Sequence, residues 1–444
     1  MHVFPQLRKL ERKYRGELAV VGVHSAKFTS EKETENLRKA VMRYELEHPV
    51  VNDSEFQVWS QYGCRAWPTL MFLDPLGKVI GKHEGEITFE DFDPIIQEMV
   101  QEFDGLGVLD RSPLSHAVEQ EPGSPLSFPG KVLADEASGR LVISDSNHNR
   151  IIVATLEGDV QEVIGQGEPG LADGAFSEAR FDHPQGLALD GDTLYVADTE
   201  NHAVRRVDLA ARRVDTIAGT GRQARAYRQG GDPRASDLSS PWDLWLHEGV
   251  LFIAMAGIHQ IWSLDLGRRT IGPYAGNGRE APVDGALLSA SLDQPSGITA
   301  DGHKLYFADS EASAIRSADL SPGGRVETIV GEGLFVFGDV DGAGDDVRLQ
   351  HPQGIDHHDG ILYVADTYNN KVKRLFPNTR SVITFAGTGE PGHRDGEASQ
   401  AALHEPSGVS VAAGRVFVAD TNNHAIRTVD LETGVVGTLE MKGV

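Results

Sequence analysis

One segment of the sequence recurs six times, and this repeat limits the folds open to most of the chain. The copies begin at prolines spaced 54 to 57 residues apart, namely Pro129, Pro184, Pro241, Pro295, Pro352 and Pro406. Each copy contains short runs of strand-forming residues separated by turn residues, as in "HPQGLALDGDTLYVADTENHAVRRVDL" (183–209). Four antiparallel strands at this period are typical of a propeller blade, because a single blade cannot bury its own faces. The sequence predicts an all-β, six-bladed propeller over residues 128–444.

The first 105 residues follow a different pattern. Apolar residues recur at helical spacing in residues 3–14, and the runs "LAVVGV" (18–23) and "TLMFLD" (69–74) are typical of buried strands. Further helical segments alternate with these strands and end with one around residues 92–103. This alternation predicts an α/β domain over residues 1–105. Residues 106–127, which contain several Pro, Ser and Gly, are predicted to be a linker.

The charge and the cysteine content narrow the function. Asp and Glu outnumber Lys and Arg by 66 to 41, so the net charge of −25 disfavours binding to nucleic acid or to an anionic membrane. A single cysteine cannot form a disulfide framework, which indicates a reducing compartment. No apolar run reaches the ~18 residues of a membrane-spanning helix, and residues 1–14 do not resemble a secretory signal. We predict a cytoplasmic monomer whose partner is a protein or a peptide.

Both regions resemble a known family. "ADTENHAVRRVDL" (197–209), "ADTNNHAIRTVDL" (419–431) and the Gly-rich "FAGTGEPGHRDG" (385–396) resemble NHL repeats. "WPTLMFLDPLGK" (67–78) and the order of the elements resemble the thioredoxin-like, or redoxin, domain that precedes such repeats in NHL-repeat-containing redoxin-like proteins. This resemblance implies a chain that joins an α/β thioredoxin-like domain to a six-bladed NHL propeller.

The resemblance also implies that the thioredoxin-like domain is incomplete. In such domains a central strand and a Cys-x-x-Cys motif come before the helix that corresponds to residues 1–14, and this sequence begins after both. Either the lineage lost its redox site, or the start was assigned at an internal methionine. We favour the second interpretation, because loss of a central strand would leave backbone groups of two buried strands without partners, at a cost of about 1–3 kcal/mol for each group.

Trp67, Pro68 and Cys64 are the candidate site residues of the thioredoxin-like domain. The resemblance implies a cis peptide bond before Pro68, whose neighbouring backbone would pair with an extended thiol substrate, with Trp67 beside it. Pro68 could also serve the fold alone, as a turn at the start of a strand. Cys64 lies next to Arg65, whose charge favours a thiolate, but a lone cysteine is more often inert. We therefore expect no complete catalytic site in this sequence.

The blades place an acid and a base at fixed positions. The acids Asp198, Asp309, Asp366 and Asp420 are each followed seven residues later by a base, namely Arg205, Arg316, Lys373 and Arg427. Asp145 corresponds to these acids in the first blade. The third blade has Met255 and Trp262 instead, so the acid and the base are lost together. This paired loss predicts a structural ion pair across each hairpin rather than a ligand site.

A second set of acids precedes the blades. Asp173, Asp284, Asp341 and Asp395 lie in Asp-Gly pairs ahead of the leading prolines. The path between blades predicts that these carboxylates ring one mouth of the channel, with His183, His351 and His404 near the same face. Such a ring would suit a divalent cation, whereas the alternative interpretation is that Asp-Gly simply makes each turn. We expect no other cofactor.

The sequence favours an interaction or scaffold protein, in which a redox-inactive thioredoxin-like module is joined to a propeller that recognises a partner. The first alternative is a thiol-disulfide oxidoreductase, if a complete form carries the Cys pair. The second is a metal-dependent hydrolase or lyase on the top face of the propeller, which needs several irregularly placed ligands around a metal with an open position. The sequence contains repeated residues instead of such a set.

Overall fold

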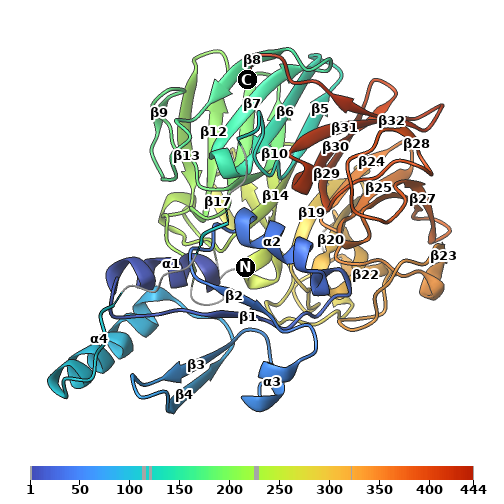
Figure 1. The fold of residues 1–444 in the computed structure, drawn as a ribbon. Coiled ribbons are helices and arrows are strands. Elements are labelled where there is room, and N and C mark those ends of the chain that lie inside the picture. Colours follow the sequence, from blue (N-terminus) through green and yellow to red (C-terminus); the bar gives the residue numbers. More distant parts are fainter. Residues whose placement is uncertain (1–2, 113–116, 120–122, 225–229, 322, 444) are drawn as a thin grey trace. The chain divides into compact units, whose positions relative to one another are not determined.

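The computed structural model describes residues 3–112, 117–119, 123–224, 230–321 and 323–443. The chain divides into two units, residues 1–122 and residues 123–444. The first unit is blue in Figure 1, and the second runs from green to red. The division falls inside residues 106–127, the segment predicted to be a linker.

The first unit alternates helices and short strands, as the sequence predicts. Its elements are α1 (Val3–Lys13), β1 (Gly22–His24), the 3-10 turn η1 (Ser30–Lys32), α2 (Thr34–Arg43), β2 (Val50–Asn52), α3 (Gln57–Gln61), β3 (Thr69–Leu73), β4 (Val79–Glu84) and α4 (Phe89–Gly105). β1 pairs with β2 in parallel, and β3 pairs with β4 in antiparallel. In the described residues these pairs form two separate sheets (Figure 1).

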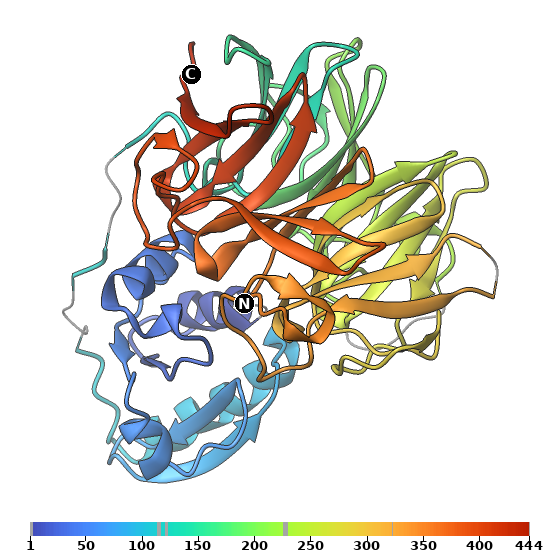
Figure 2. The same ribbon diagram turned by 90° about the vertical axis from the view of Figure 1, so that its right-hand side faces the viewer.

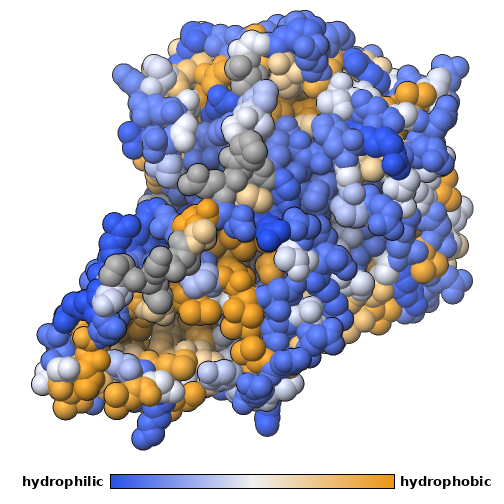
Figure 3. All heavy atoms as spheres, in the orientation of Figure 1, coloured by the Kyte–Doolittle hydropathy of each residue, from blue (hydrophilic) through white to orange (hydrophobic). Residues whose placement is uncertain are grey.

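The strand predicted from "LAVVGV" is shorter in the structure, where β1 begins at Gly22. Asp53 N donates to His24 O, so one edge of β1 is bonded to β2. The other edge pairs with no strand in the part of the chain that the structure describes, and Val21 and Val23 are 55% and 42% exposed. A strand that is paired on one side only has fewer backbone hydrogen bonds, which explains its shortening. Figure 3 shows apolar residues of this unit, in orange, around a hollow in the lower part of the view.

The core of the first unit lies between α1, α4 and the sheet of β3 and β4. Leu10 of α1 and Phe92 and Ile96 of α4 are buried, and Leu70 and Phe72 of β3 pack against them. The helical spacing of apolar residues at the start of the chain therefore faces this core. Acidic residues in the first turn of α4 favour its N-terminal end.

The second unit contains, in the described residues, six antiparallel sheets that form the blades of a ring (Figures 1 and 2). Blade 1 contains β5 (Val132–Asp135), β6 (Arg140–Asp145), β7 (Arg150–Thr155) and β8 (Val160–Ile164). Blade 2 contains β9 (Gly174–Ala175), β10 (Pro184–Asp190), β11 (Thr193–Asp198), β12 (Ala203–Asp208) and β13 (Arg213–Ala218). Blade 3 contains β14 (Pro241–His247), β15 (Val250–Met255), β16 (Gln260–Asp265) and β17 (Thr270–Ala275).

The remaining blades follow in chain order. Blade 4 contains β18 (Gly285–Ala286), β19 (Pro295–Ala300), β20 (Lys304–Asp309), β21 (Ala314–Asp319) and β22 (Arg325–Val330). Blade 5 contains β23 (Gly342–Ala343), β24 (Gly354–His358), β25 (Ile361–Asp366), β26 (Lys371–Phe376) and β27 (Ser381–Ala386). Blade 6 contains β28 (Gly396–Glu397), β29 (Pro406–Ala412), β30 (Arg415–Asp420), β31 (Ala425–Asp430) and β32 (Val435–Leu439). The 3-10 turns are η2 (Ser146–His148), η3 (Pro233–Ala235), η4 (Ala256–Ile258), η5 (Ser310–Ala312), η6 (Gly344–Asp346), η7 (Thr367–Asn369) and η8 (Thr421–Asn423). The predicted six-bladed propeller is confirmed.

The hydrophobic cores of the propeller lie between neighbouring blades. Val142 and Ile151 of blade 1, for example, share one cluster with Leu187 and Val196 of blade 2. The inner strands also meet in order around the ring, and β29 of blade 6 lies beside β5 of blade 1. Each sheet therefore buries its two faces only when both neighbours are present, which is the reason that the repeat closes into a ring.

Four blades carry, in the described ranges, a fifth strand that the sequence analysis missed. β9, β18, β23 and β28 pair in antiparallel with the outermost strand of their blade, as Gly174 does with Val214. Each begins directly after the aspartate of an Asp-Gly pair. The Asp-Gly pairs therefore start a short strand at the outer edge of the blade.

The ring closes where blade 6 meets blade 1, and each blade consists of consecutive strands. Ser407 Oγ donates to Gly130 O over 2.6 Å, and Ala134 N donates to Ser410 Oγ over 3.0 Å. These bonds join the inner strands of the first and last blades.

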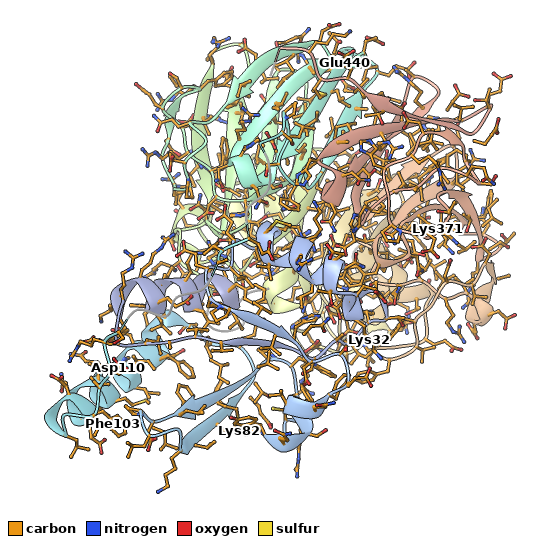
Figure 4. The ribbon with its side chains drawn as sticks, in the orientation of Figure 1. Lys32, Lys82, Phe103, Asp110, Lys371 and Glu440 are labelled. Atoms are coloured by element: carbon orange, nitrogen blue, oxygen red, sulfur yellow. The ribbon has the colours of Figure 1, made fainter. Side chains whose placement is uncertain are left out.

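The segment after β32 also joins these two blades. It carries Glu440 in Figure 4 and continues along the outer strand of blade 1. Val160 N donates to Lys442 O over 3.0 Å, and Lys442 N donates to Gly158 O over 2.9 Å. This segment thus covers the start of β8, as the two-residue strands cover the outer strands of other blades.

Candidate functional site

A partly exposed aromatic surface lies beside Pro68 in the thioredoxin-like unit, and it consists of exposed Trp67 with half-buried Phe56 and Trp59. The peptide bond between Trp67 and Pro68 is cis, as predicted. The ring centroid of Trp67 lies 4.5 Å from that of Trp59 and 6.5 Å from that of Phe56. Trp67 is 46% exposed, yet its Nε1 donates to Ser25 O over 2.8 Å. The indole is therefore fixed and solvent-facing at once.

Asp53 positions the aromatic surface by ordering the start of α3. Its carboxylate accepts hydrogen bonds from Val58 N over 3.0 Å, from Trp59 N over 2.9 Å and from Ser25 Oγ over 2.8 Å. Burial alone would raise the pKa of Asp53, but the bonds from Trp59 N and its other donors lower it below the usual value. A buried carboxylate thus ties α3 to the residue that holds the Trp67 indole.

Cys64 lies in the segment between α3 and β3 and is half-buried. Its backbone N donates to Trp59 O over 3.0 Å, and Lys82, labelled in Figure 4, donates to the preceding carbonyl of Gly63 over 2.9 Å. No hydrogen bond reaches its sulfur from the described residues, and the chain has no second thiol. Among the described residues, no base is hydrogen-bonded to the Cys64 thiol, so this arrangement does not support the redox role considered for Cys64.

The predicted ion pairs form across the hairpins. The N–O distances are 2.7 Å for Asp198–Arg205, 2.8 Å for Asp309–Arg316, 3.7 Å for Asp366–Lys373 and 2.7 Å for Asp420–Arg427, and all these side chains are buried. Asp145 accepts from Arg150 Nε over 2.7 Å instead, because Ile152 occupies the usual position of the base. Asp420 also accepts from the N–H of His404 over 2.7 Å. The prediction that an acid and a base pair across these hairpins is therefore confirmed.

The four Asp-Gly carboxylates do not ring the mouth of the channel, and this prediction is wrong. Asp173 accepts from Arg205 Nη2 over 3.0 Å and from Thr216 N over 2.8 Å, beside the outermost strand of its blade. The equivalent contacts to the buried base are 3.0 Å for Asp284, 2.8 Å for Asp341 and 2.5 Å for Asp395. The link between blades runs along the outer strand first, which places these acids at the rim. They complete the ion pairs of their own blades.

The predicted histidines lie in separate blades. His183 Nδ1 is 2.9 Å from Asp182 Oδ1 and 3.8 Å from Glu200 Oε2, and ligand atoms of these three residues lie within 4.8 Å of one another. His351 stacks on Tyr368 with ring centroids 4.5 Å apart. Asp182 and His183 are hydrogen-bonded to each other. A divalent cation at this face stays a prediction.

Sequence reasoning missed Phe56 and Trp59, because neither follows a repeat or a motif. Four aromatic residues within twelve positions (Phe56, Trp59, Tyr62 and Trp67), in a chain with few aromatics, were the available signal. The structure brings them together because α3 returns the chain to the start of β3.

Comparisons with known proteins agree with this architecture. A family model for a thioredoxin-like domain matches residues 1–79, and a model for the NHL repeat matches residues 181–206 and 403–428. The chain is 45% identical to protein SUPPRESSOR OF QUENCHING 1, chloroplastic, of Arabidopsis thaliana, over 100% of this chain and 44% of that protein. It is 39% identical to NHL repeat-containing protein 2 of Bos taurus, over 98% of this chain and 65% of that protein. The chain thus spans about half to two thirds of the length of these curated relatives.

Solved structures match this chain only at low sequence identity. A chain of the nidogen/laminin complex matches with a TM-score of 0.46 and 15% identity, over 68% of this chain and 92% of that chain. None of the helices in the described residues is long and apolar enough to cross a membrane. The blades, the thioredoxin-like unit and the two relatives that match nearly the whole chain lead to one assignment: the chain is an NHL-repeat protein with an N-terminal thioredoxin-like domain.

Proposed function

We propose that this chain is an interaction protein whose thioredoxin-like unit binds an extended peptide at the aromatic surface, while the propeller acts as a rigid scaffold. The observation that carries the proposal is the state of Trp67, which is exposed but held by Ser25 and Trp59. A large aromatic side chain that is already immobile loses little entropy when a partner covers it. Such residues dominate the binding energy of interfaces.

The polar residues of the propeller support a scaffold role. The acids and bases that recur in blades 2, 4, 5 and 6 are bonded to one another within the blade, as Arg205 is to Asp198 and to Asp173. These acids and bases stabilise the sheet, and their charges are paired with one another rather than directed at a ligand. A rigid frame of this kind suits a protein that presents surfaces to a partner, and the net charge of −25 disfavours nucleic acid as that partner.

A thiol-disulfide oxidoreductase is the second candidate, and the match of residues 1–79 to a thioredoxin-like family favours it. That activity needs a second thiol to resolve the mixed disulfide, and this chain has only Cys64. We propose that this chain is redox-inactive. A cytoplasmic, monomeric protein remains our expectation, although the name of the plant relative places that protein in the chloroplast.

A peptide-display selection on the purified full chain tests the proposal. Peptides selected by the wild-type protein should bind Trp67→Ala at least about tenfold more weakly, since the loss of an aromatic anchor at a hot spot costs about 2 kcal/mol or more. Leu76→Ala, which removes an exposed side chain from the turn between β3 and β4, is the matched control and should bind as the wild type does. Equal affinity of the Trp67→Ala variant, or a selection that yields no peptide, would refute the proposal.

A further inference from the structure

The inner strands of the propeller approach one another most closely two residues after each leading proline. The residues at this position are Lys131, Gly186, Asp243, Gly297, Gly354 and Gly408. A Cβ atom on Gly297 would lie 2.6 Å from Gln353 O, and one on Gly408 would lie 2.8 Å from the Cα atom of Lys131. Four blades therefore have no room for a side chain here. Blades 1 and 3 instead place a lysine and an aspartate at this level.

The ammonium group of Lys131 crosses the axis of the ring. Lys131 begins in blade 1, and its Nζ donates to Ser296 O of blade 4 over 2.8 Å and to Gln353 O, just before β24 of blade 5, over 2.5 Å. Asp243 Oδ2 of blade 3 lies 3.4 Å away. Since blade 4 is opposite blade 1 in a ring of six, the side chain must span the centre. Lys131 is only 4% exposed, so three acceptors from three blades surround a buried cation.

Asp243 is bonded as an ionised carboxylate. Its Oδ1 accepts from Leu244 N over 2.9 Å, and its Oδ2 accepts from Ile298 N of blade 4 over 3.1 Å. Burial raises the pKa of Asp243 and lowers the pKa of Lys131, and the attraction between the two groups opposes both shifts. Each charge therefore depends on the other, and both depend on the closed ring.

Two carbonyl oxygens and one carboxylate oxygen are the ligands that a hard cation prefers. We propose that Lys131 is the resident cation of the propeller axis: its ammonium group occupies the place that a bound ion would take and ties blades 1, 3, 4 and 5 together. This inference stands apart from the peptide-binding proposal, because it concerns a different unit of the chain. It also disfavours the alternative of a metal-dependent hydrolase, because a metal ion at this level of the axis would have to displace the Lys131 ammonium group.

Removal of the lysine should convert this place into an ion site. Lys131→Ala would leave the three acceptors around a cavity, whereas Lys131→Met would fill the cavity without a charge. We expect both variants to melt about 5–10 °C below the wild type. Calcium, potassium or methylammonium chloride, each at matched ionic strength, should restore at least half of the loss for Lys131→Ala. The same salts should leave Lys131→Met and the wild type unchanged.

Several results would overturn the proposal. One is a Lys131→Ala variant that melts at the wild-type temperature. Another is that none of the three cations raises the melting temperature of Lys131→Ala more than it raises that of Lys131→Met. If Lys131→Ala is insoluble, it is refolded in each salt: recovery only with a cation supports the proposal, and failure in all three contradicts it. Lys373→Ala, which removes the buried base of blade 5 away from the axis, controls for a general effect of cations on a missing lysine.

Discussion

The carboxylate of Asp356 on β24 accepts a hydrogen bond of 2.7 Å from the N–H of Val411 on β29, and this bond joins blades 5 and 6 near their inner strands. The other oxygen of Asp356 accepts from His357 N over 2.9 Å. Unlike Asp243, Asp356 has no lysine or arginine among its hydrogen-bond partners in the described residues. Burial raises its pKa from 3.8 to about 6.

This shift predicts a contribution to stability that falls as the pH rises. Because the pKa in the folded state exceeds the unfolded value, the folded protein binds the proton more tightly between pH 4 and pH 6. The free energy of unfolding of the wild type, relative to Asp356→Asn, should therefore fall by up to about 3 kcal/mol from pH 4 to pH 7. Urea denaturation at both pH values measures the difference. Asp359→Asn, at an exposed position, is the control, and a pH-independent difference for Asp356→Asn would contradict the prediction.

The ion pair of Asp198 and Arg205 predicts strong coupling between the two residues. Asp198→Met alone leaves a buried guanidinium without its main acceptor and should cost about 3–5 kcal/mol. The double variant Asp198→Met/Arg205→Trp reproduces the pair found in blade 3 and should cost less than the sum of the single variants. A double-mutant cycle of denaturation measurements checks this. Additive costs would show that the two residues act independently. Arg212→Ala, at a surface pair with Glu162, should change stability by less than about 1 kcal/mol.

The open edge of β1 predicts aggregation through the thioredoxin-like unit. Val21→Lys/Val23→Lys places charges along this edge, and charged side chains oppose edge-to-edge pairing. We expect slower aggregation at 37 °C by light scattering, with an unchanged melting transition of the propeller. Leu288→Lys, at an exposed apolar position of the propeller, should aggregate at the wild-type rate. Equal rates for all three proteins would show that this edge does not drive association.

The single thiol predicts no catalytic turnover of a disulfide substrate. Without a resolving thiol, exchange at Cys64 stops at the mixed disulfide. The wild type and Cys64→Ser should therefore reduce insulin in dithiothreitol at the same background rate. A rate that falls in Cys64→Ser would establish a redox role for this residue.

The segment after β32 predicts a contribution to ring closure. A variant without residues 440–444 loses the bonds to Gly158 and Val160 and uncovers the start of β8. We expect a melting temperature about 2–4 °C lower by calorimetry. Lys442→Ala keeps the backbone bonds and should melt within about 1 °C of the wild type; a similar loss in both variants would assign the effect to the side chain.

The ring could be predicted from the sequence because six prolines keep one spacing and each copy has the same strand pattern. The position of Asp173 at the rim could not be predicted, because it depends on the path of the segment that links blades 1 and 2. The pairing of Gly174 with Val214 in the structure defines that path. Lys131 was visible as an exception among glycines. The role of Lys131 could not be predicted, because an alignment of the blades does not show which distant carbonyl groups, such as Ser296 O, accept hydrogen bonds from its side chain.

The site in the thioredoxin-like unit was only half predicted. Pro68 and its cis bond followed from a motif, whereas Phe56 and Trp59 joined Trp67 through a short helix whose start depends on buried Asp53. Such contacts arise from tertiary packing, and neither local propensity nor periodicity carries them.

In the described residues each blade is one uninterrupted stretch of chain, and none of these strands passes from the last blade into the first. Every strand pair would survive if the chain were rejoined at its ends and opened at another blade boundary. The propeller is therefore open to circular permutation at any of its blade junctions, and the present order of blades is one of six equivalent ways to thread the same ring.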